Sequence, residues 1–432
     1  MTRALGLDFG TTNTVMAVCD DATGAVAPVA FTMADEKVEA LRSALCFWKQ
    51  GVSSAKPQIE AGPWAIAQYI AHPDESRFMQ SLKTFAASPF FEGTYAFGKR
   101  YRFEELLNVF FDRILSYAGG KLETKTRRLV VGRPVTFAGA SPDPALATKR
   151  YDSAFQHYGF SEILFVYEPV AAAFFFARTL KKSAKVLVAD FGGGTTDYSI
   201  INFDVSKTGL KANPLAHGGV GLAGDTFDYR IIDHVILPHL GKGTQFRSMG
   251  KVLDMPQSIF ASFARWNLLS VLKSSDEFRK LKDMLRTCLE PDKLQRFIDL
   301  VEDDQGYPLY KAISAAKAEL SSKDSTEFSF PPLGKGFHAT ITRQDFEGWI
   351  AHDLMRMEQA LDETLIAANL KDQDIDKVFL TGGTSFVPAV RAIFERRYGT
   401  ERIEAGSELL SIANGLALIG ERDDAATWSV TN

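Results

Sequence analysis

Short apolar runs of strand length alternate with longer amphipathic stretches along this chain. The strand-like runs are rich in Val, Leu, Ile and Phe and lie at residues 4–7, 15–18, 128–133, 163–167, 186–189, 198–203 and 378–381. Apolar residues recur at helical spacing in other stretches, at residues 64–71, 103–117, 144–158, 170–180, 343–369, 387–398 and 408–420. Because strands that alternate with helices pair into helix-covered sheets, the pattern predicts an α/β fold.

The pattern that opens the chain begins again near its middle, which indicates a duplicated α/β half. We expect a first lobe over residues 1–182 and a second lobe over residues 183–405. A helix over residues 406–421 is expected to return toward the first lobe. The polar tail, residues 422–432, is expected to fray because it carries few apolar residues to bury.

Residues 222–322 differ from the rest of the second lobe in their pattern of apolar and charged residues. Long helical patterns with charged edges fill this stretch, and we expect residues 241–310 to be all-helical. Such an insertion could pass a signal to a protein partner or client. It could equally be a satellite subdomain that only makes the second lobe more rigid.

Two glycine–threonine turns, each led by an aspartate, follow the first strand of each half. The first spans residues 8–13 and the second residues 190–197. Glycines let backbone N–H groups approach an anion, and threonine hydroxyls add hydrogen-bond donors. One such turn alone is no more than a tight hairpin. Two matching copies predict that both turns hold the phosphates of one nucleotide.

A third glycine turn, residues 382–384, lies between an apolar strand and a helix. The free N–H groups at the start of a helix attract partial negative charge. This turn is an ordinary strand–helix loop or, given its place late in the second half, part of a nucleoside site.

Asp8 and Asp190 begin the two phosphate turns, and a phosphate repels both of them. If they face one cleft, two carboxylates ~5 Å apart repel by ~3 kcal/mol at an effective dielectric of ~20. Mg²⁺ between them, bound mainly through water molecules, would remove this repulsion. Alternatively, each aspartate accepts N–H bonds within its own turn. We favour the cation because the Asp–Gly–Thr order occurs twice.

Glu168 stands at the junction of a strand and a very apolar helix. It either complements the positive end of that helix or positions a water molecule at a phosphate, and the residues alone leave both roles open. Lys83 is one of many lysines, most of which are solvated surface charges.

Composition excludes several classes of function. The chain has 432 residues and a net charge of −4, so nothing suggests nucleic-acid binding. Its 3 cysteines have no metal-like or redox-like spacing, which favours a cytoplasmic protein. The longest apolar stretch, residues 170–177, is far below the ~20 residues of a membrane helix.

The motifs together resemble the actin-like ATPase superfamily, and most of all the ATPase domain of the seventy-kilodalton heat-shock chaperones. They occur in the family's order, at residues 6–13 (GLDFGTTN), 167–173 (YEPVAAA), 188–197 (VADFGGGTTD), 222–228 (LAGDTFD) and 380–388 (LTGGTSFVP). The resemblance covers about residues 3–421 and implies a two-lobed, ribonuclease H-like duplicated fold with a helical insertion in the second lobe. The family's peptide-binding β-sandwich has no counterpart among the motifs, so we expect the chain to lack that domain.

The resemblance also implies site residues and cofactors, ATP or ADP with Mg²⁺. Lys83, Glu168, Asp190 and Thr195 would be catalytic, with Lys83 on the γ-phosphate and Glu168 beside the attacking water. Asp8 and Asp190 would organise Mg²⁺ through its water shell. The implied nucleotide contacts are Asp8, Gly10, Thr11, Thr12, Asn13, Gly192, Gly193, Gly194, Gly224, Lys317, Gly382, Gly383, Thr384 and Phe386.

The chain departs from the family where adenine binds. Basic family positions are replaced by Ala318 and Phe386, and a polar one by Ser314, whereas Lys317 is kept. A phenylalanine face could still stack on adenine. The leading hypothesis is therefore an Mg²⁺-dependent ATPase whose lobes open and close and which acts through a partner. A small-molecule kinase, or a non-catalytic nucleotide sensor or filament subunit, are the alternatives.

Overall fold

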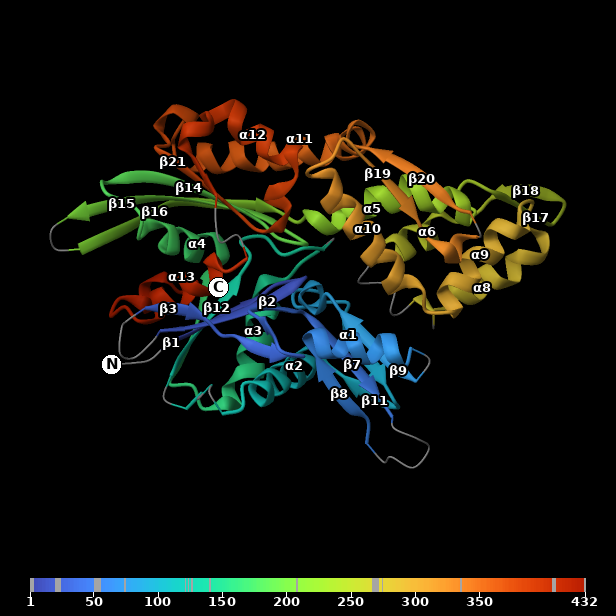
Figure 1. Cartoon of the computed structure of the whole chain (residues 1–432), viewed down its shortest axis with the longest axis horizontal. Helices are drawn as coiled ribbons and strands as arrows, with labels where there is room; N and C mark the ends of the chain where they lie inside the picture. The colour runs from blue at the N-terminus through green and yellow to red at the C-terminus, as the bar shows by residue number, and fades with distance from the viewer. Residues whose placement is uncertain are drawn as a thin grey trace. The chain divides into compact units, whose positions relative to one another are not determined.

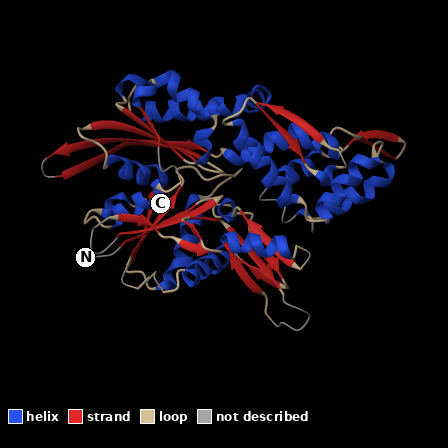
Figure 2. Ribbon diagram, viewed as in Figure 1, coloured by secondary structure: helices blue, strands red, loops and turns tan. Residues whose placement is uncertain are grey.

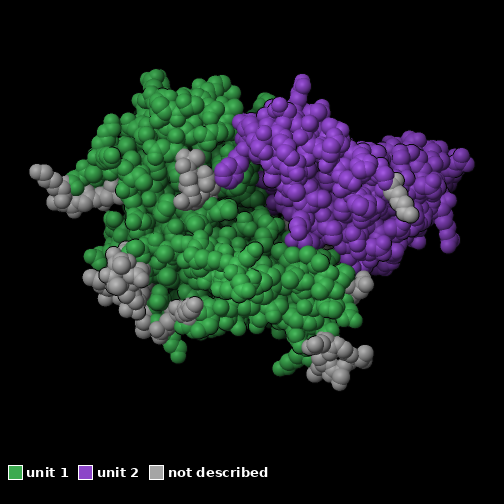
Figure 3. All heavy atoms as spheres, viewed as in Figure 1, with its two compact units in different colours: residues 1–223, 355–385, 390–432 green, residues 224–354, 386–389 purple. Residues whose placement is uncertain are grey.

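The computed structural model describes residues 4–19, 25–49, 56–73, 75–120, 122, 124–125, 127–139, 141–206, 209–265, 272–273, 275–334, 336–405 and 409–430. The chain divides into two compact units (Figure 3). The first unit contains residues 1–223, 355–385 and 390–432, and the second contains residues 224–354 and 386–389. The predicted lobe boundary at residues 182–183 thus falls inside the first unit, and the lobe division stays a prediction.

Two large sheets form the framework of the first unit (Figures 1 and 2). The first sheet has the strand order β13-β12-β1-β2-β3, with β6 also paired to β2, and the second has the order β16-β15-β14-β21-β22. The strands of the first sheet are β1 (Ala4–Phe9), β2 (Asn13–Cys19), β3 (Val26–Pro28), β6 (Ala40–Arg42), β12 (Arg128–Arg133) and β13 (Glu162–Tyr167). The strands of the second are β14 (Ala184–Phe191), β15 (Thr196–Ser206), β16 (Gly209–Val220), β21 (Lys377–Thr381) and β22 (Ile403–Ala405).

The two sheets share one topology. In each, the central strand (β1 or β14) pairs antiparallel with the next strand in sequence and parallel with a strand on its other side. The outer strands repeat the rule, since β13 and β22 are parallel to their neighbours whereas β3 and β16 are antiparallel to theirs. The predicted α/β class is confirmed, and the matching sheets agree with a duplicated half.

Helices α4 (Glu168–Ala177) and α13 (Ser411–Gly420) lie between the two sheets (Figure 1). Each follows the outer parallel strand of one sheet and packs against the other sheet, α4 on β14 and β15, and α13 on β1 and β2. The helices also pack on each other, and their backbones approach very closely. A Cβ atom built on Gly415 would lie 1.8 Å from the Ala171 carbonyl oxygen, so only glycine permits this contact.

Smaller elements complete the first unit around an aromatic core. Phe9, at the end of β1, packs against Phe110 with ring centroids 5.6 Å apart. The helices are α1 (Gly62–Ala71), α2 (Phe103–Tyr117) and α3 (Pro144–Phe155), with the short 3₁₀ helix η1 (Leu82–Phe85). The strands are β4 (Phe31–Met33), β5 (Glu36–Val38), β7 (Ala44–Trp48), β8 (Gln58–Ala61), β9 (Ser76–Gln80), β10 (Thr94–Ala96) and β11 (Lys99–Tyr101).

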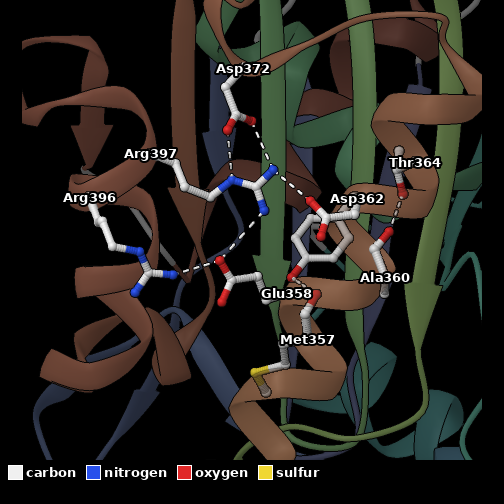
Figure 4. A network of polar contacts seen from close by, with 9 residues as sticks. Met357, Glu358, Ala360, Asp362, Thr364, Asp372, Arg396 and Arg397 are labelled. Carbon is white, nitrogen blue, oxygen red and sulfur yellow. Dashed lines mark hydrogen bonds and ion pairs between the residues drawn. The ribbon is translucent and has the colours of Figure 1, made fainter.

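Arg397 joins three elements of the first unit (Figure 4). Its guanidinium donates to both carboxylate oxygens of Asp372, at 3.0 and 2.9 Å, and pairs with Asp362 at 2.6 Å. Arg396 binds Glu358 at 2.6 Å, and Arg397 also approaches Glu358. These contacts fasten helix α12 (Pro388–Tyr398) to α11 (Arg343–Ala367), so the helix that follows the third glycine turn has a fixed support.

The second unit is mostly helical but includes two β-hairpins. Its helices are α5 (Gly224–Ile231), α6 (Gln257–Ala264), α8 (Asp276–Met284), α9 (Pro291–Glu302) and α10 (Gly306–Leu320), and its strands are β17 (Gln245–Ser248), β18 (Lys251–Asp254), β19 (Ser325–Ser329) and β20 (His338–Thr342). The all-helical prediction for residues 241–310 is wrong at β17 and β18. Met249 and Gly250 take φ values of +48° and +77°, which suits a two-residue hairpin turn. The hairpin is largely exposed, so its strands carry no apolar alternation that could reveal them.

Two further features of the structure differ from what the sequence predicts. Strand β16 is not among the strands that the sequence predicts, because Pro214 and several glycines weaken its strand pattern. Proline is tolerated at such an edge strand with a register shift. The tail does not fray over the described residues 421–430. Ala425 is fully buried, the Trp428 ring packs on Phe174 with centroids 4.7 Å apart, and the Val430 N–H donates to the Phe165 carbonyl at 2.7 Å.

The predicted helices and strands are otherwise found near their expected bounds. The last helix was expected from residue 408, which lies outside the described residues, and α13 begins at Ser411. Within the described part of the chain, no helix is both long enough and apolar enough to cross a membrane.

Gly415→Ala should destabilise the protein although alanine is the better helix former. The added methyl group must push α4 and α13 apart, which we expect to cost about 1–3 kcal/mol of unfolding free energy. Gly348→Ala, in helix α11, is the matched control, since a Cβ added there meets no atom within 4 Å among the residues that the structure describes. Its melting temperature should stay the same or rise, because alanine exceeds glycine in helix propensity by about 1 kcal/mol. Equal melting temperatures for both variants would contradict the close helix contact.

Candidate functional site

The first phosphate turn joins β1 to β2 and is held by hydrogen bonds on both sides. The Gly10 N–H donates to the Asn13 carbonyl at 3.0 Å, and a Cβ atom on Gly10 would lie 2.3 Å from the same oxygen. Ser43 clamps the turn from outside, since its N–H donates to the Thr12 carbonyl at 3.0 Å and its hydroxyl to the Gly10 carbonyl at 2.6 Å. These hydrogen bonds fix the backbone of the turn. The Thr11 and Thr12 residues are partly exposed.

The second phosphate turn joins β14 to β15 with the same closing hydrogen bond. The Gly192 N–H donates to the Thr195 carbonyl at 3.0 Å. A Cβ atom built on Gly194 would lie 3.3 Å from the Thr11 hydroxyl oxygen, so the tips of the two turns are neighbours. The sequence predicted that these turns face one ligand, and the structure does bring them together.

A buried ion pair between Lys83 and Glu168 lies beside the turns. Lys83 is 6% exposed and Glu168 4% exposed, and the ammonium donates directly to the carboxylate. Lys83 comes from η1, which follows Ser81 in a left-handed conformation with φ of +54°. Glu168 is the first residue of α4, with Pro169 next, as expected for a helix start. The ion pair therefore joins two segments 85 residues apart in sequence.

Burial disfavours the charged ammonium and by itself lowers the pKa of Lys83. The interactions with Glu168 and, to a smaller extent, with Tyr151 and Asp8 are larger in total, so the pKa of Lys83 is raised. Lys83 thus stays positively charged at any physiological pH.

Three aspartates share this region with Glu168. Exclusion of water, and secondarily the charge of Glu168, raises the pKa of Asp8 to about 7. Burial, and secondarily the charge of Glu168, raises the pKa of Asp197 to about 7. The pKa of Asp190 is also raised, by burial first and then by the charges of Glu168 and Asp197. The predicted repulsion between Asp8 and Asp190 is therefore present, although it is smaller than the effect of burial.

Asp197 links the second turn to the end of β12. Its Oδ1 atom accepts hydrogen bonds from the N–H groups of Val135, at 2.7 Å, and Thr136, at 3.0 Å. Sequence reasoning missed Asp197 as a site residue, although it closes the second aspartate–glycine–threonine motif and could have been found there.

Arg133 is a second buried cation near the cluster and was also missed. It is the last residue of β12 and is 3% exposed. Its guanidinium carbon lies 5.2 Å from the Phe137 ring centre and 5.5 Å from that of Tyr167. Burial lowers the pKa of Arg133, while Tyr167, Tyr151, Glu168 and Asp197 act in the opposite direction. An arginine at the end of an apolar strand was the only signal in the sequence.

The third glycine turn is attached to the second phosphate turn. Gly382 has φ of +83°, which favours glycine, and a Cβ atom there would lie 2.2 Å from the Phe191 carbonyl oxygen. The Thr384 hydroxyl donates to the Gly192 carbonyl at 3.0 Å. No atom of the described residues lies within 4 Å of a Cβ built on Gly383, so its face is open within that part of the chain. This turn is thus more than a connector, because it helps fix the second turn.

Three of the predicted nucleotide contacts, Gly224, Lys317 and Phe386, belong to the second unit. The structure of the first unit therefore does not place them at the phosphate turns. Within the second unit, the Lys317 ammonium donates to the Gly224 carbonyl at 3.1 Å and pairs with Asp228 at 2.8 Å. Phe386 is 55% exposed. Their part in nucleotide binding stays a prediction.

Among the described residues, no group of three or more His, Cys, Asp or Glu side chains is arranged to hold a metal ion directly. The carboxylates near the turns could instead act on a metal through its water molecules, which needs no direct ligand cage.

Comparison with known proteins assigns a family. The family model described as "Hsp70 protein" matches residues 86–245 and 282–421. The chain is 25% identical over 442 residues to the "Chaperone protein DnaK" of Mycoplasmopsis synoviae, covering 99% of this chain and 60% of the relative. It is 28% identical over 425 residues to the protein of the same name from Thermotoga petrophila, covering 96% of this chain and 58% of the relative.

The chain thus spans about three fifths of the length of these curated relatives. The matched residues include Glu168, both ends of the second phosphate turn and the third glycine turn. On this evidence the chain belongs to the Hsp70 protein family.

Proposed function

We propose that this protein binds and hydrolyses ATP with Mg²⁺, and that the nucleotide controls how it acts on a partner, as a chaperone-type ATPase. The observation that carries the proposal is the meeting of the two phosphate turns, Gly194 against Thr11, beside the Lys83–Glu168 pair. The relatives named as chaperone proteins support a chaperone-type role.

The turns supply what a polyphosphate needs. Backbone N–H groups of glycine turns and threonine hydroxyls bind phosphate oxygens without adding negative charge. Gly10, Thr11 and Thr12 would hold the phosphates from one side, and Gly192–Thr195 from the other. Asn13 would support the first turn, because its carbonyl already closes it.

The charges near the turns fit a divalent cation. If all four carboxylates near the turns are ionised (Asp8, Glu168, Asp190 and Asp197), they exceed the two cations Lys83 and Arg133 by two negative charges. In the free protein the raised pKa values of the three aspartates keep part of this charge protonated. One Mg²⁺ would neutralise this excess. Asp8 and Asp190 would hold it through its water shell, and the ion would offset the charge of the phosphates.

Lys83 and Glu168 would act on the reacting atoms. The Lys83 ammonium, fixed by its ion pair, would stabilise negative charge on the γ-phosphate. Glu168 would orient the attacking water, and the Thr195 hydroxyl would hold the γ-phosphate from the second turn.

ATP and ADP would then favour different states, because only the γ-phosphate reaches both turns at once. A ligand shifts a conformational equilibrium only through such differential contacts. The nucleoside would lie near Gly382, Gly383 and Thr384. Gly224, Lys317 and Phe386 are also proposed as nucleotide contacts, with Phe386 stacking on the base in place of a basic side chain.

The partner or client is proposed to bind through the second lobe. A kinase and a non-catalytic nucleotide sensor remain testable alternatives. Phosphate release without any acceptor molecule identifies an ATPase, absence of turnover with tight ATP binding identifies a sensor, and sedimentation with ATP reveals a filament.

Asp190→Asn should separate activity from stability. The carboxylate is unfavourable where it is buried, so its neutral isostere should keep or raise the melting temperature. ATP turnover should fall about 100-fold or more, because a site charge that complements the metal and phosphates is lost. Thr195→Ala should also lower turnover. The control is Asp276→Asn, an acid in an exposed ion pair, which should change neither quantity. Normal turnover in Asp190→Asn would remove the proposed site.

The free protein should lose stability as the pH rises from about 4 to about 7. Asp8 and Asp197 have pKa values of about 7 in the folded protein against 3.8 as their ordinary value. Between these pH values the folded chain holds more protons than the unfolded chain, so raising the pH through the window favours unfolding.

This effect is measured as melting temperature against pH without nucleotide. The double variant Asp8→Asn, Asp197→Asn should show a flatter profile than the natural chain, and added Mg²⁺–ADP should restore stability at pH 8. A natural-chain profile that is already flat, or that rises, would contradict the crowding of carboxylates.

A further inference from the structure

Arg150, on helix α3, binds the backbone of one short segment through two nitrogen atoms of its guanidinium. Nη1 donates hydrogen bonds to the carbonyls of Phe85 at 2.8 Å, Ala86 at 2.9 Å and Ser88 at 3.0 Å, and Nη2 donates to the carbonyl of Phe91 at 2.7 Å. The segment starts at the last residue of η1, the 3₁₀ helix that carries Lys83. One side chain therefore anchors the chain directly after the buried ion pair.

Residues 86–91 need such an anchor because they belong to no helix or strand. Ala86 and Ala87 are buried, and buried carbonyl groups require a hydrogen-bond partner. The start of α3 supplies a further one, since the Asp143 N–H donates to the Ala87 carbonyl at 2.8 Å. Helix α3 thus provides the partners that a neighbouring strand would provide in a sheet.

Backbone hydrogen bonds carry this anchor to Lys83. The Ala86 N–H donates to the Lys83 carbonyl at 3.1 Å, so Ala86 is held by Arg150 at its carbonyl and holds Lys83 with its amide. Before Lys83, Ser81 lies in the left-handed region with φ of +54°, which residues other than glycine seldom adopt. Such a conformation persists only where its surroundings enforce it. The position of η1 therefore depends on contacts outside the helix itself.

We propose that Arg150 is a positioning residue, which fixes η1 through residues 85–91 and so holds the Lys83 ammonium where the γ-phosphate would bind. This inference rests on the proposed ATP hydrolysis. Packing alone does not require an arginine at this position. The guanidinium carbon lies 6.0 Å from the centre of the Phe103 ring, and an apolar side chain of similar length would cover that ring as well.

The test is Arg150→Met, which keeps most of the side-chain length and removes all four hydrogen bonds. ATP turnover should fall about 10- to 100-fold, because small displacements of a catalytic group have effects of this size. KM should change less than about twofold, since the phosphate turns are closed by hydrogen bonds of their own.

The matched control is Arg128→Met. Arg128 also donates to backbone carbonyls, of Gly420 at 2.6 Å and Arg422 at 3.2 Å, but it begins β12, whereas Arg133 near the site ends that strand. Both variants should lose thermal stability, and only Arg150→Met should lose turnover.

Chemical labelling of Lys83 gives a readout that needs no nucleotide. The free proteins are treated briefly with acetic anhydride, and acetylation of Lys83 is quantified by mass spectrometry. Lys83 should be protected in the natural chain and in Arg128→Met, and should be labelled several-fold faster in Arg150→Met. If the natural chain does not hydrolyse ATP, the proposed function fails, whereas the labelling still decides whether Arg150 fixes Lys83.

Arg150→Lys gives the same comparison if Arg150→Met does not fold. Lysine keeps the charge, but its three donors lie on one atom and cannot reproduce bonds made by two nitrogens of a planar fork. Labelling of Lys83 should therefore rise in this variant too. Normal turnover or full protection of Lys83 in the folded Arg150 variant would overturn the inference. Equal labelling of Lys83 in the Arg150 and Arg128 variants would also overturn it, because it indicates only a general loss of stability.

Discussion

The buried ion pair between Lys83 and Glu168 is the interaction on which the rest of the site depends. It places one positive charge among four carboxylates, and without it their burial would be far less favourable. Two buried charges are costly to desolvate, and removing one partner strands the other. In general, well-packed apolar residues in place of a buried ion pair are often as stable or more stable, so this pair is not explained by stability alone. The excess negative charge of the ionised carboxylates is the feature that a divalent cation would relieve.

The duplicated framework explains how residues far apart in sequence meet at this pair. Each half ends its central strand in an aspartate and a glycine turn, and each sends its last helix onto the other sheet. The glycine contact between α13 and α4 brings the two sheets close enough for Gly194 to reach Thr11. The Thr384 hydroxyl then holds the third turn against the second, and the Arg397 network (Figure 4) supports the helix that follows the third turn.

Much of the fold and the phosphate turns could be predicted from the sequence, because apolar periodicity and glycine–threonine turns are local signals. The 15-residue helix α2 begins and ends where its pattern does. Strand β16 and the β17–β18 hairpin were missed since edge and exposed strands need no apolar alternation. Arg133 was missed for another reason, since its burial beside the Tyr167 ring depends on tertiary packing, and no spacing in the chain records that contact. The ordered tail depends likewise on a tertiary contact, between Trp428 and Phe174.

The central claim is that the two turns hold a metal-bound triphosphate beside Lys83 and Glu168. Calorimetric titration of the natural chain with ATP, in the presence of Mg²⁺ and again with the metal chelated, tests it most directly. The account predicts tight one-to-one binding with Mg²⁺, much weaker binding without it, and weaker binding of AMP, which lacks the outer phosphates. No binding of ATP, or equal binding of ATP and AMP with and without the metal, would contradict it.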